Sequence, residues 1–244
     1  MTATLKMMTV ADSPLSAQER YSVFPFYICM DVSESMSGEP ISAVNKQLPL
    51  LRTSIGSDPA VAEVIRVGII TFSDTATSVL PLSDLSMVDA IPELVARGRT
   101  SYAAMFDHVF KVIESDYHAS RSAGDRWYRP AVILISDGRP TDESERWRSA
   151  LSRLTDPSWK RRPNILAFGF GDADPAVLSA VTSAKANRAF VAAEGADPAT
   201  VIPELLAGLV QSIVSSSASV YDGQALLETP QLASMRAIPV DELD

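Results

Sequence analysis

The stretch that decides the fold reads Phe26-Tyr27-Ile28-Cys29-Met30-Asp31-Val32-Ser33-Glu34-Ser35-Met36. Its first five residues are all apolar, which is typical of a short strand that is buried on both faces. An aspartate follows at once, then two serines at alternate positions, then a turn and a helical pattern that opens at Pro40. This order predicts a βα unit, and open α/β sheets bind their ligands at such strand-end loops. One carboxylate and two hydroxyls are hard ligands, suited to Mg²⁺, Ca²⁺ or Mn²⁺ rather than to zinc.

Composition limits the classes of function. The chain has 244 residues, enough for one large domain or two small ones, and 46% of them are hydrophobic. Its net charge of −9 makes it a poor generic partner for nucleic acid or for an anionic membrane. No apolar run approaches the ~20 residues that span a bilayer. Residues 1–20 lack the pattern of a secretory signal, so we expect a cytoplasmic protein.

The rest of the chain alternates strand patterns with amphipathic helical patterns. Strands are predicted over 24–30, 66–72, 75–80, 131–135, 164–170 and 189–192, and helices over 40–55, 102–116, 144–154, 175–184 and 198–215, with a weaker helical stretch over 84–95. Pro49 predicts a kink or an early end of the first helix, and Pro81 an end of the third strand. The alternation predicts a Rossmann-like, doubly wound, mostly parallel six-stranded α/β sheet, with one antiparallel edge strand and helices on both faces.

The domain boundaries follow from composition. Residues 21–215 read as a single domain without an internal repeat or linker. Residues 1–20 resemble a flexible leader, and 216–244 a Ser-rich and polar C-terminal tail that is either poorly ordered or docked on a partner.

Oxygen-bearing side chains follow the predicted strands in three separate loops. Asp31, Ser33 and Ser35 come after the first strand, Thr100 precedes the helix at 102, and Asp137 follows the strand at 131–135. The fold brings such loops to one edge of the sheet. Neutral hydroxyls do not cancel the charge of a bound cation. If the two aspartates act through water, the ion stays electrophilic and keeps a coordination position for an incoming carboxylate.

These segments, in this order, resemble a von Willebrand factor A (VWA) domain with its metal-ion-dependent adhesion site (MIDAS). The similarity covers about residues 24–214. Within that family, the segments DVSESMSGEPI at 31–41 and ISDGRPTD at 135–142 are most similar to the bacterial TerY-type proteins of tellurium-resistance gene clusters.

The resemblance implies a site and a role. The metal site would consist of Asp31, Ser33, Ser35, Thr100 and Asp137, with the hydroxyls as direct or state-dependent ligands and the aspartates often acting through water. It implies a divalent cation, most often Mg²⁺, and binding of a partner protein through an Asp or Glu carboxylate rather than catalysis. Kinase and phosphatase components encoded nearby are the partners that the TerY similarity suggests.

Two positions depart from the family pattern. Glu34 stands where glycine is common, and Arg99 where a second glycine often precedes the threonine. Glu34 adds negative charge beside the ion, which strengthens metal binding and repels an acidic partner, whereas Arg99 acts in the opposite direction.

Other interpretations of the same residues remain open. Asp31, Ser33, Ser35 and Thr100 are also residue types of helix caps, and Asp137-Gly138 of a turn. Asp31 after a buried strand has the placement of the nucleophile in a Mg²⁺-dependent phosphotransferase or phosphatase, although Ser33 stands where such enzymes place a second carboxylate. In a third interpretation, the ion only ties three loops together, and no partner depends on it.

Overall fold

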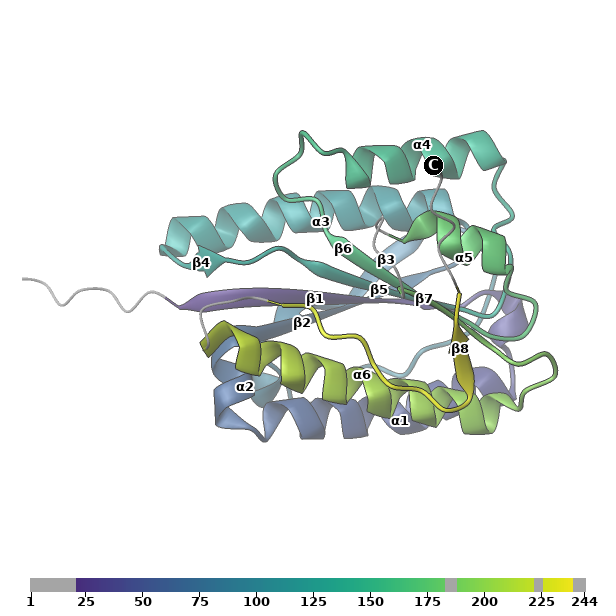
Figure 1. Ribbon diagram of the computed structural model, residues 1–244, viewed down its shortest axis with the longest axis horizontal. Helices are drawn as coiled ribbons and strands as arrows, with labels where there is room; N and C mark the ends of the chain where they lie inside the picture. The colour runs from purple at the N-terminus through teal and green to yellow at the C-terminus, as the bar shows by residue number, and fades with distance from the viewer. Residues whose placement is uncertain (1–20, 183–187, 222–225, 239–244) are drawn as a thin grey trace, which may run out of the picture.

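The computed structural model describes residues 21–182, 188–221 and 226–238, and the predicted leader at 1–20 lies outside these ranges. One sheet runs through the middle of the molecule, with helices on both of its faces (Figure 1). Its strands are β1 (Ser22–Asp31), β2 (Ile65–Phe72), β3 (Ala76–Ser83), β4 (Arg126–Trp127), β5 (Ala131–Ser136), β6 (Asn164–Gly169), β7 (Ala189–Ala192) and β8 (Met235–Ala237). The helices are α1 (Glu39–Gly56), α2 (Pro59–Val64), α3 (Tyr102–Ala123), α4 (Ser144–Thr155), α5 (Pro175–Val181) and α6 (Pro198–Tyr221), with short 3₁₀ turns η1 (Glu34–Met36) and η2 (Leu85–Met87).

The sheet confirms the predicted fold class. Its strand order is β3-β2-β1-β5-β6-β7-β8, and β1, β2, β5, β6 and β7 are parallel to their neighbours within that group. The described residues form eight strands, so the predicted count of six is wrong. The two missed strands are β4, a two-residue pairing with β1, and β8, which pairs antiparallel with β7. Antiparallel strands therefore close both edges, β3 at one and β8 at the other, rather than one edge as predicted.

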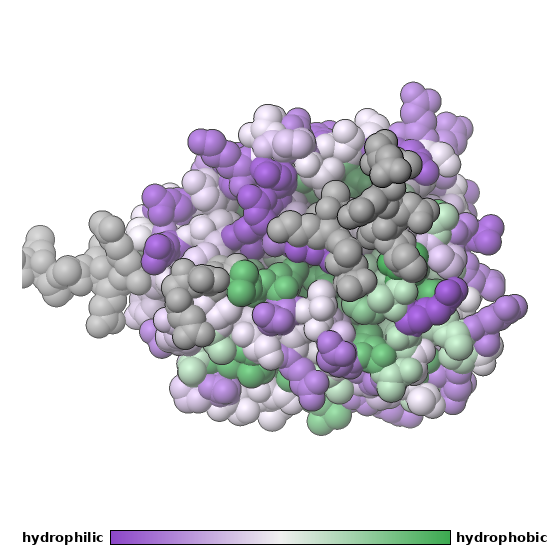
Figure 2. All heavy atoms as spheres, in the orientation of Figure 1, coloured by the Kyte–Doolittle hydropathy of each residue, from purple (hydrophilic) through white to green (hydrophobic). Residues whose placement is uncertain are grey.

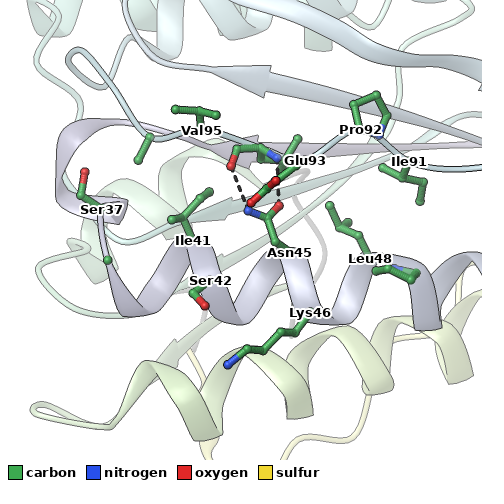
Figure 3. Close-up of a pocket in the computed structure, with 14 residues that line it drawn as sticks. Ser37, Ile41, Ser42, Asn45, Lys46, Leu48, Ile91, Pro92, Glu93 and Val95 are labelled. Atoms are coloured by element: carbon green, nitrogen blue, oxygen red, sulfur yellow. Dashed lines mark hydrogen bonds between the residues drawn. The ribbon is translucent and has the colours of Figure 1, made fainter.

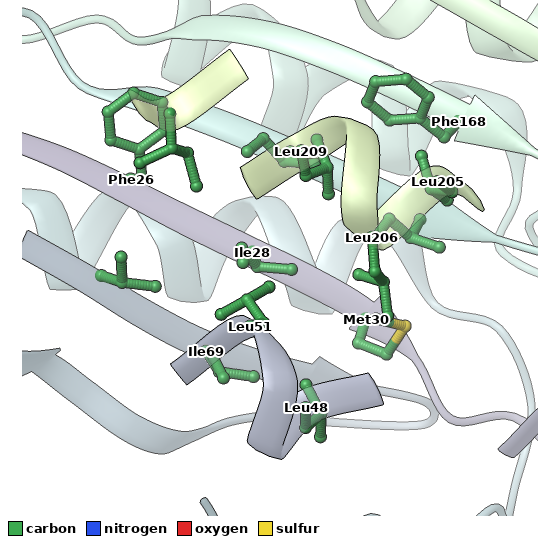
Figure 4. Packing of buried hydrophobic residues seen from close by; sticks show 14 of the residues in the cluster. Phe26, Ile28, Met30, Leu48, Leu51, Ile69, Phe168, Leu205, Leu206 and Leu209 are labelled. Atoms are coloured by element: carbon green, nitrogen blue, oxygen red, sulfur yellow. The ribbon is translucent and has the colours of Figure 1, made fainter. Parts of the chain in front are cut away.

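Strand β1 lies at the centre because both of its faces are buried. Phe26, Ile28 and Met30 point into a core that β1 and its neighbours share with α1 and α6 (Figure 4). Tyr27 and Cys29 point into a second core, which α3, α4 and α5 cover. The unbroken apolar run is what a strand between two helical layers requires.

The early helix end that was one of the two outcomes predicted for Pro49 is wrong, and so is the strand end predicted at Pro81. Pro49 lies inside α1, and the helix continues to Gly56 instead of ending early. Pro81 lies inside β3 and does not end it. β3 is an edge strand with a shifted register near this point, where a missing N–H costs no ladder hydrogen bond.

The helix predicted over 84–95 is wrong. Only η2 is helical there, and the following residues run as an extended segment along α1. The Asn45 side chain holds this segment through two hydrogen bonds of 2.9 Å to the backbone N–H and carbonyl of Leu94 (Figure 3). Arg52 donates to the carbonyl of Val88 at 2.9 Å. Tertiary hydrogen bonds from α1 therefore replace the local helical ones.

The end of the last helix, predicted at residue 215, is also wrong. Helix α6 continues to Tyr221, and Ser216 and Ser217 are buried within it. Residues 226–238 then return along α6 and end in β8 (Figure 1). Serines fit here because their hydroxyls bond within the helix and to the returning chain: Ser216 donates to the Ser212 carbonyl at 2.6 Å and accepts from the Glu228 N–H at 3.0 Å.

Helix α6 meets the criteria of length and composition for a membrane span, with a mean hydropathy of 1.4, contrary to the expectation from the sequence. Half of that window is buried inside the protein, and α6 lies against α1 and the sheet. Core helices pass the same criteria. On the face seen in Figure 2, hydrophobic residues form small separate patches among hydrophilic and neutral ones.

Candidate functional site

Three loops meet at the carboxyl edge of the parallel strands, and backbone hydrogen bonds join them. The segment before α3 is fixed to the loop after β1, because Arg97 donates to the Val32 carbonyl at 2.7 Å and Glu34 donates to the Gly98 carbonyl at 2.9 Å. The loop after β5 is joined in turn, because the backbone N–H of Thr141 donates to the Thr100 carbonyl at 2.8 Å. Residues more than a hundred positions apart in the sequence thus share one small volume.

Asp31 lies at the base of this edge, fully buried at the end of β1. Its Oδ1 accepts from the backbone N–H of Ser33 at 2.8 Å, and its Oδ2 accepts from the hydroxyl of Ser136 at 2.6 Å. Both oxygens therefore have protein partners that hold the carboxylate in one orientation. A carboxylate held in this way fixes the backbone of the loop after β1 and adds negative charge beneath the serine hydroxyls.

Ser33, Ser35 and Asp137 are brought into direct contact. The two serine hydroxyl oxygens lie 3.1 Å apart, and the Ser35 hydroxyl donates to Asp137 Oδ1 at 2.9 Å. Ser33 is buried whereas Ser35 is exposed, so the cluster reaches from the interior to the surface. The sequence prediction that these side chains share one place is confirmed for this trio.

Thr100 lies beside the trio and is buried. A Cβ atom placed on Gly138 would lie 3.6 Å from the Thr100 hydroxyl oxygen and 3.8 Å from that of Ser35, so the two hydroxyls flank this glycine. The Thr100 side chain makes no hydrogen bond with another described residue. Ser101, not Thr100, caps α3: its side chain accepts from the Ala104 N–H at 3.1 Å. The alternative role of Thr100 as the helix cap is therefore wrong.

The cap interpretation fails for Ser33 as well. Ser33 stands at the start of η1, but its side chain makes no capping hydrogen bond there. Its hydroxyl faces Ser35 instead. Neither the Ser33 hydroxyl nor the Thr100 hydroxyl caps a helix, so both are available to a ligand.

Burial disfavours the ionised forms of the two carboxyls of the site, Asp31 and Asp137. Burial raises the pKa of Asp31, against the opposing effect of its hydrogen bonds with Ser136 and Ser33. Burial also raises the pKa of Asp137 to about 6; the nearby charge of Asp31 adds to the increase, and the hydrogen bond from Ser35 opposes it. Among the described residues, no cationic side chain contributes to either change. Two buried carboxyls without a positive partner favour a bound cation, which would lower both pKa values again.

The spacing of the oxygens fits a small divalent ion. Mg²⁺ binds oxygens at 2.0–2.1 Å in octahedral geometry, which places neighbouring ligands about 2.9 Å apart, whereas Ca²⁺ at 2.3–2.6 Å spreads them to about 3.4 Å. The observed separations of 3.1 and 2.9 Å are hydrogen bonds between the protein groups, so they show that the oxygens converge but do not select one ion over the other. The donors are hydroxyls and carboxylates, and the described residues contain no group of three or more His, Cys, Asp or Glu side chains placed to hold a metal ion. The donors are hard oxygen ligands, which suit a divalent cation in general.

The site opens into a cleft of ≈ 880 Å³. Ser35, Thr100 and Asp137 are among the residues that line it. A separate cavity of ≈ 680 Å³ lies between the first half of α1 and residues 91–96 (Figure 3). None of the five predicted ligand residues lines that second cavity, so the cleft is the one that belongs to the site.

Comparison with known families identifies this architecture. The model of the von Willebrand factor type A domain matches residues 26–203, which include the second half of β1 and all five predicted ligand residues. The chain belongs to the von Willebrand factor type A domain family. A search of curated proteins finds no match for this VWA domain.

Solved structures agree on the fold. Three of them are a von Willebrand factor type A protein from Catenulispora acidiphila (16% identity, TM-score 0.57, 79% of this chain and 43% of that one), the pilus adhesin SpaC from Lactobacillus rhamnosus GG in an open conformation (16%, 0.60, 81% and 30%), and proximal thread matrix protein 1 of the mussel byssus with a zinc-occupied MIDAS motif (16%, 0.52, 81% and 49%). This VWA domain therefore spans less than half the length of each of these chains.

Sequence reasoning missed the residues that support the site. Ser136 anchors Asp31. Thr141 bonds to the Thr100 carbonyl through both its N–H and its hydroxyl, the latter at 3.0 Å. Asp142 accepts from the Ser101 hydroxyl and from the Ala103 N–H, both at 2.8 Å, and so ties the loop after β5 to the start of α3. The polar run from 136 to 142 was the available signal, but only the fold shows what each residue contacts.

Proposed function

We propose that this VWA domain is a metal-dependent protein-interaction module. Asp31, Ser33, Ser35, Thr100 and Asp137 form its MIDAS and hold a divalent cation, most often Mg²⁺, with Mn²⁺ or Ca²⁺ as substitutes. The ion binds an Asp or Glu carboxylate of a partner protein. The observation that carries the proposal is the contact of the Ser33, Ser35 and Asp137 oxygens at about 3 Å beside the buried, uncompensated carboxyl of Asp31.

The hydroxyl ligands explain why a partner carboxylate would be attracted. Serine and threonine hydroxyls are neutral, so they leave most of the charge of the ion uncancelled. Asp31 has both oxygens engaged by Ser33 and Ser136, which favours a role through water rather than direct ligation. The ion remains electrophilic, and the exposed side of Ser35 faces the cleft through which a carboxylate would enter.

The biological setting is the finer part of the proposal. The segments 31–41 and 135–142 resemble the bacterial TerY-type proteins, which suggests a cytoplasmic role in a stress-response system of the tellurium-resistance type. Kinase or phosphatase components encoded nearby are the partners to test first. Glu34 is exposed beside the site, and Arg99 is exposed and pairs with Asp74 at 3.4 Å, so both are placed to bias the choice of partner.

Partner capture tests this proposal. The immobilised domain should retain a co-expressed neighbouring kinase or phosphatase component in Mg²⁺ and release it in EDTA, and the Ser33→Ala/Ser35→Ala variant should retain little in either condition. Restoring Mg²⁺ after EDTA should restore capture. Capture that EDTA leaves unchanged would contradict a bridging ion.

The phosphotransferase alternative has less support from the geometry. An aspartate nucleophile needs an accessible oxygen, whereas Asp31 is fully buried and both its oxygens accept hydrogen bonds. Phosphate release from a phosphomonoester that disappears in Asp31→Asn would favour the enzyme. The scaffold alternative predicts a large rise of the melting temperature with metal and no metal-dependent partner.

A further inference from the structure

One residue that lines the cleft, Arg236, lies outside the range of the family match. Residues 26–203 match the VWA model, and β8 at Met235–Ala237 lies beyond that range. β8 pairs antiparallel with β7, with Val191 opposite Arg236 and Ala192 opposite Met235. Val191, Ala192 and Arg236 line the same cleft as Ser35, Thr100 and Asp137, and the sheet order separates β7 and β8 from β5 by β6. The C-terminal strand thus helps to build the entrance to the predicted ion site.

The position of Arg236 is fixed by the packing of the segment before it. The Glu204 carboxylate on α6 accepts from the backbone N–H groups of Ala233 and Ser234, the latter at 3.0 Å. Met235 is buried in the core, and the Ile238 N–H donates to the Ala189 carbonyl at 2.7 Å. Alternation along the strand then leaves Arg236 exposed next to the buried Met235. The guanidinium is therefore presented by ordered structure.

The residues that line the cleft include three acidic and two basic side chains. Asp137 stands at the ion end, and Asp172 lies beside it, because its N–H donates to the Asp137 carbonyl at 2.9 Å. Glu194 adds a third acid on the rim. Arg236 forms no ion pair with another described residue. Arg139, the other cation of the cleft, pairs with Asp174 at 3.7 Å.

We propose that the cleft binds an acidic segment of a partner that presents two carboxylates, one to the ion and one to Arg236. This inference rests on the proposed function, because the first carboxylate needs the ion. Val191, Ala192 and Pro175 supply an apolar surface in the same cleft for the residues between the two acids. Arginine suits the second contact because its planar guanidinium can donate two parallel hydrogen bonds to a carboxylate. Glu194 and Asp172 disfavour segments that carry acids elsewhere.

Peptide binding tests the inference. The probes are acetylated, amidated peptides with two glutamates separated by one to five glycines, each compared with a control in which the second glutamate is glutamine. In saturating Mn²⁺, at least one two-acid peptide should bind about 5- to 10-fold more tightly than its control, as expected for one charge-assisted contact. Arg236→Gln should reduce this ratio to near one, and Arg236→Glu should invert it. Arg146→Gln, an exposed arginine on α4 outside the cleft, should keep the ratio.

The outcomes separate this inference from the proposed function. If the single-acid peptides bind only with metal and no two-acid peptide binds more tightly, the ion site stands and the role of Arg236 is wrong. A two-acid advantage that persists in Arg236→Gln would also overturn it. If no peptide shows metal-dependent binding, both proposals fail. Thermal unfolding of the Arg236 variants confirms that β8 remains folded, as expected for an exposed side chain.

Discussion

Alanine at both Ser33 and Ser35 is expected to weaken Mg²⁺ and Mn²⁺ binding at least about 100-fold, because loss of even supporting residues costs 10–100-fold at metal sites. The two hydroxyl oxygens lie 3.1 Å apart and form the centre of the oxygen cluster. Alanine removes both donors without adding bulk, so the fold should persist. Calorimetric titration of the wild type and the variant measures the effect, with acetate present as a stand-in for the partner carboxylate.

The matched control for that variant is Ser37→Ala/Ser42→Ala. Both serines are exposed, follow the same loop into α1 and line the separate cavity beside α1. This control should bind both ions like the wild type. Equal loss of binding in the control, or undiminished binding in Ser33→Ala/Ser35→Ala, would place the ion elsewhere.

Asparagine in place of Asp137 should stabilise the metal-free protein and abolish its response to metal. Burial raises the pKa of Asp137 to about 6, above the value near 3.8 in the unfolded chain. The folded state therefore holds this proton more tightly, and ionisation costs stability as the pH rises from about 4 to 6. A difference of about two pKa units corresponds to about 3 kcal/mol, and solvent at the mouth of the cleft screens part of it, which leaves an expected gain of about 1–2 kcal/mol.

Asparagine suits this test because its amide oxygen can still accept the hydrogen bond from Ser35. Chemical unfolding in EDTA should show the Asp137→Asn variant more stable than the wild type at pH 7 and equal to it near pH 4. Added Mg²⁺ should stabilise the wild type and not the variant. Asp89→Asn, an exposed acid away from the cleft, controls for the change in net charge. Lower stability of Asp137→Asn in EDTA at pH 7 would contradict an uncompensated carboxylate.

The fold was largely predictable because the residues of β1 indicate that both faces of this strand are buried. The five apolar residues from Phe26 to Met30 require burial on two faces, and the alternation of strands and helices around them leaves few other architectures. The family match confirms the VWA resemblance that three short segments suggested. The prediction of Ser33, Ser35 and Asp137 as neighbours succeeded because the ends of parallel strands meet at one edge.

The failures have physical causes that lie outside local sequence patterns. The segment over 84–95 has some helical periodicity, but Asn45 and Arg52 on α1 satisfy its backbone groups in an extended form. β8 is three residues long, and its strand exists only because β7 offers an edge and Glu204 fixes the preceding turn. The serines after residue 215 have the composition of a polar tail, yet Ser216 lies within α6 and its hydroxyl forms hydrogen bonds there.

The most direct test of the central claim is an anomalous difference map from crystals grown with Mn²⁺. The ion should appear as a single strong peak within about 2.2 Å of the hydroxyl oxygens of Ser33 and Ser35, close to the distances that small divalent ions make with oxygen. Asp137 and Thr100 should border the same peak, directly or through water. A peak in another part of the molecule, or no peak at these hydroxyls in saturating Mn²⁺, would contradict a metal-dependent interaction module built on this edge of the sheet.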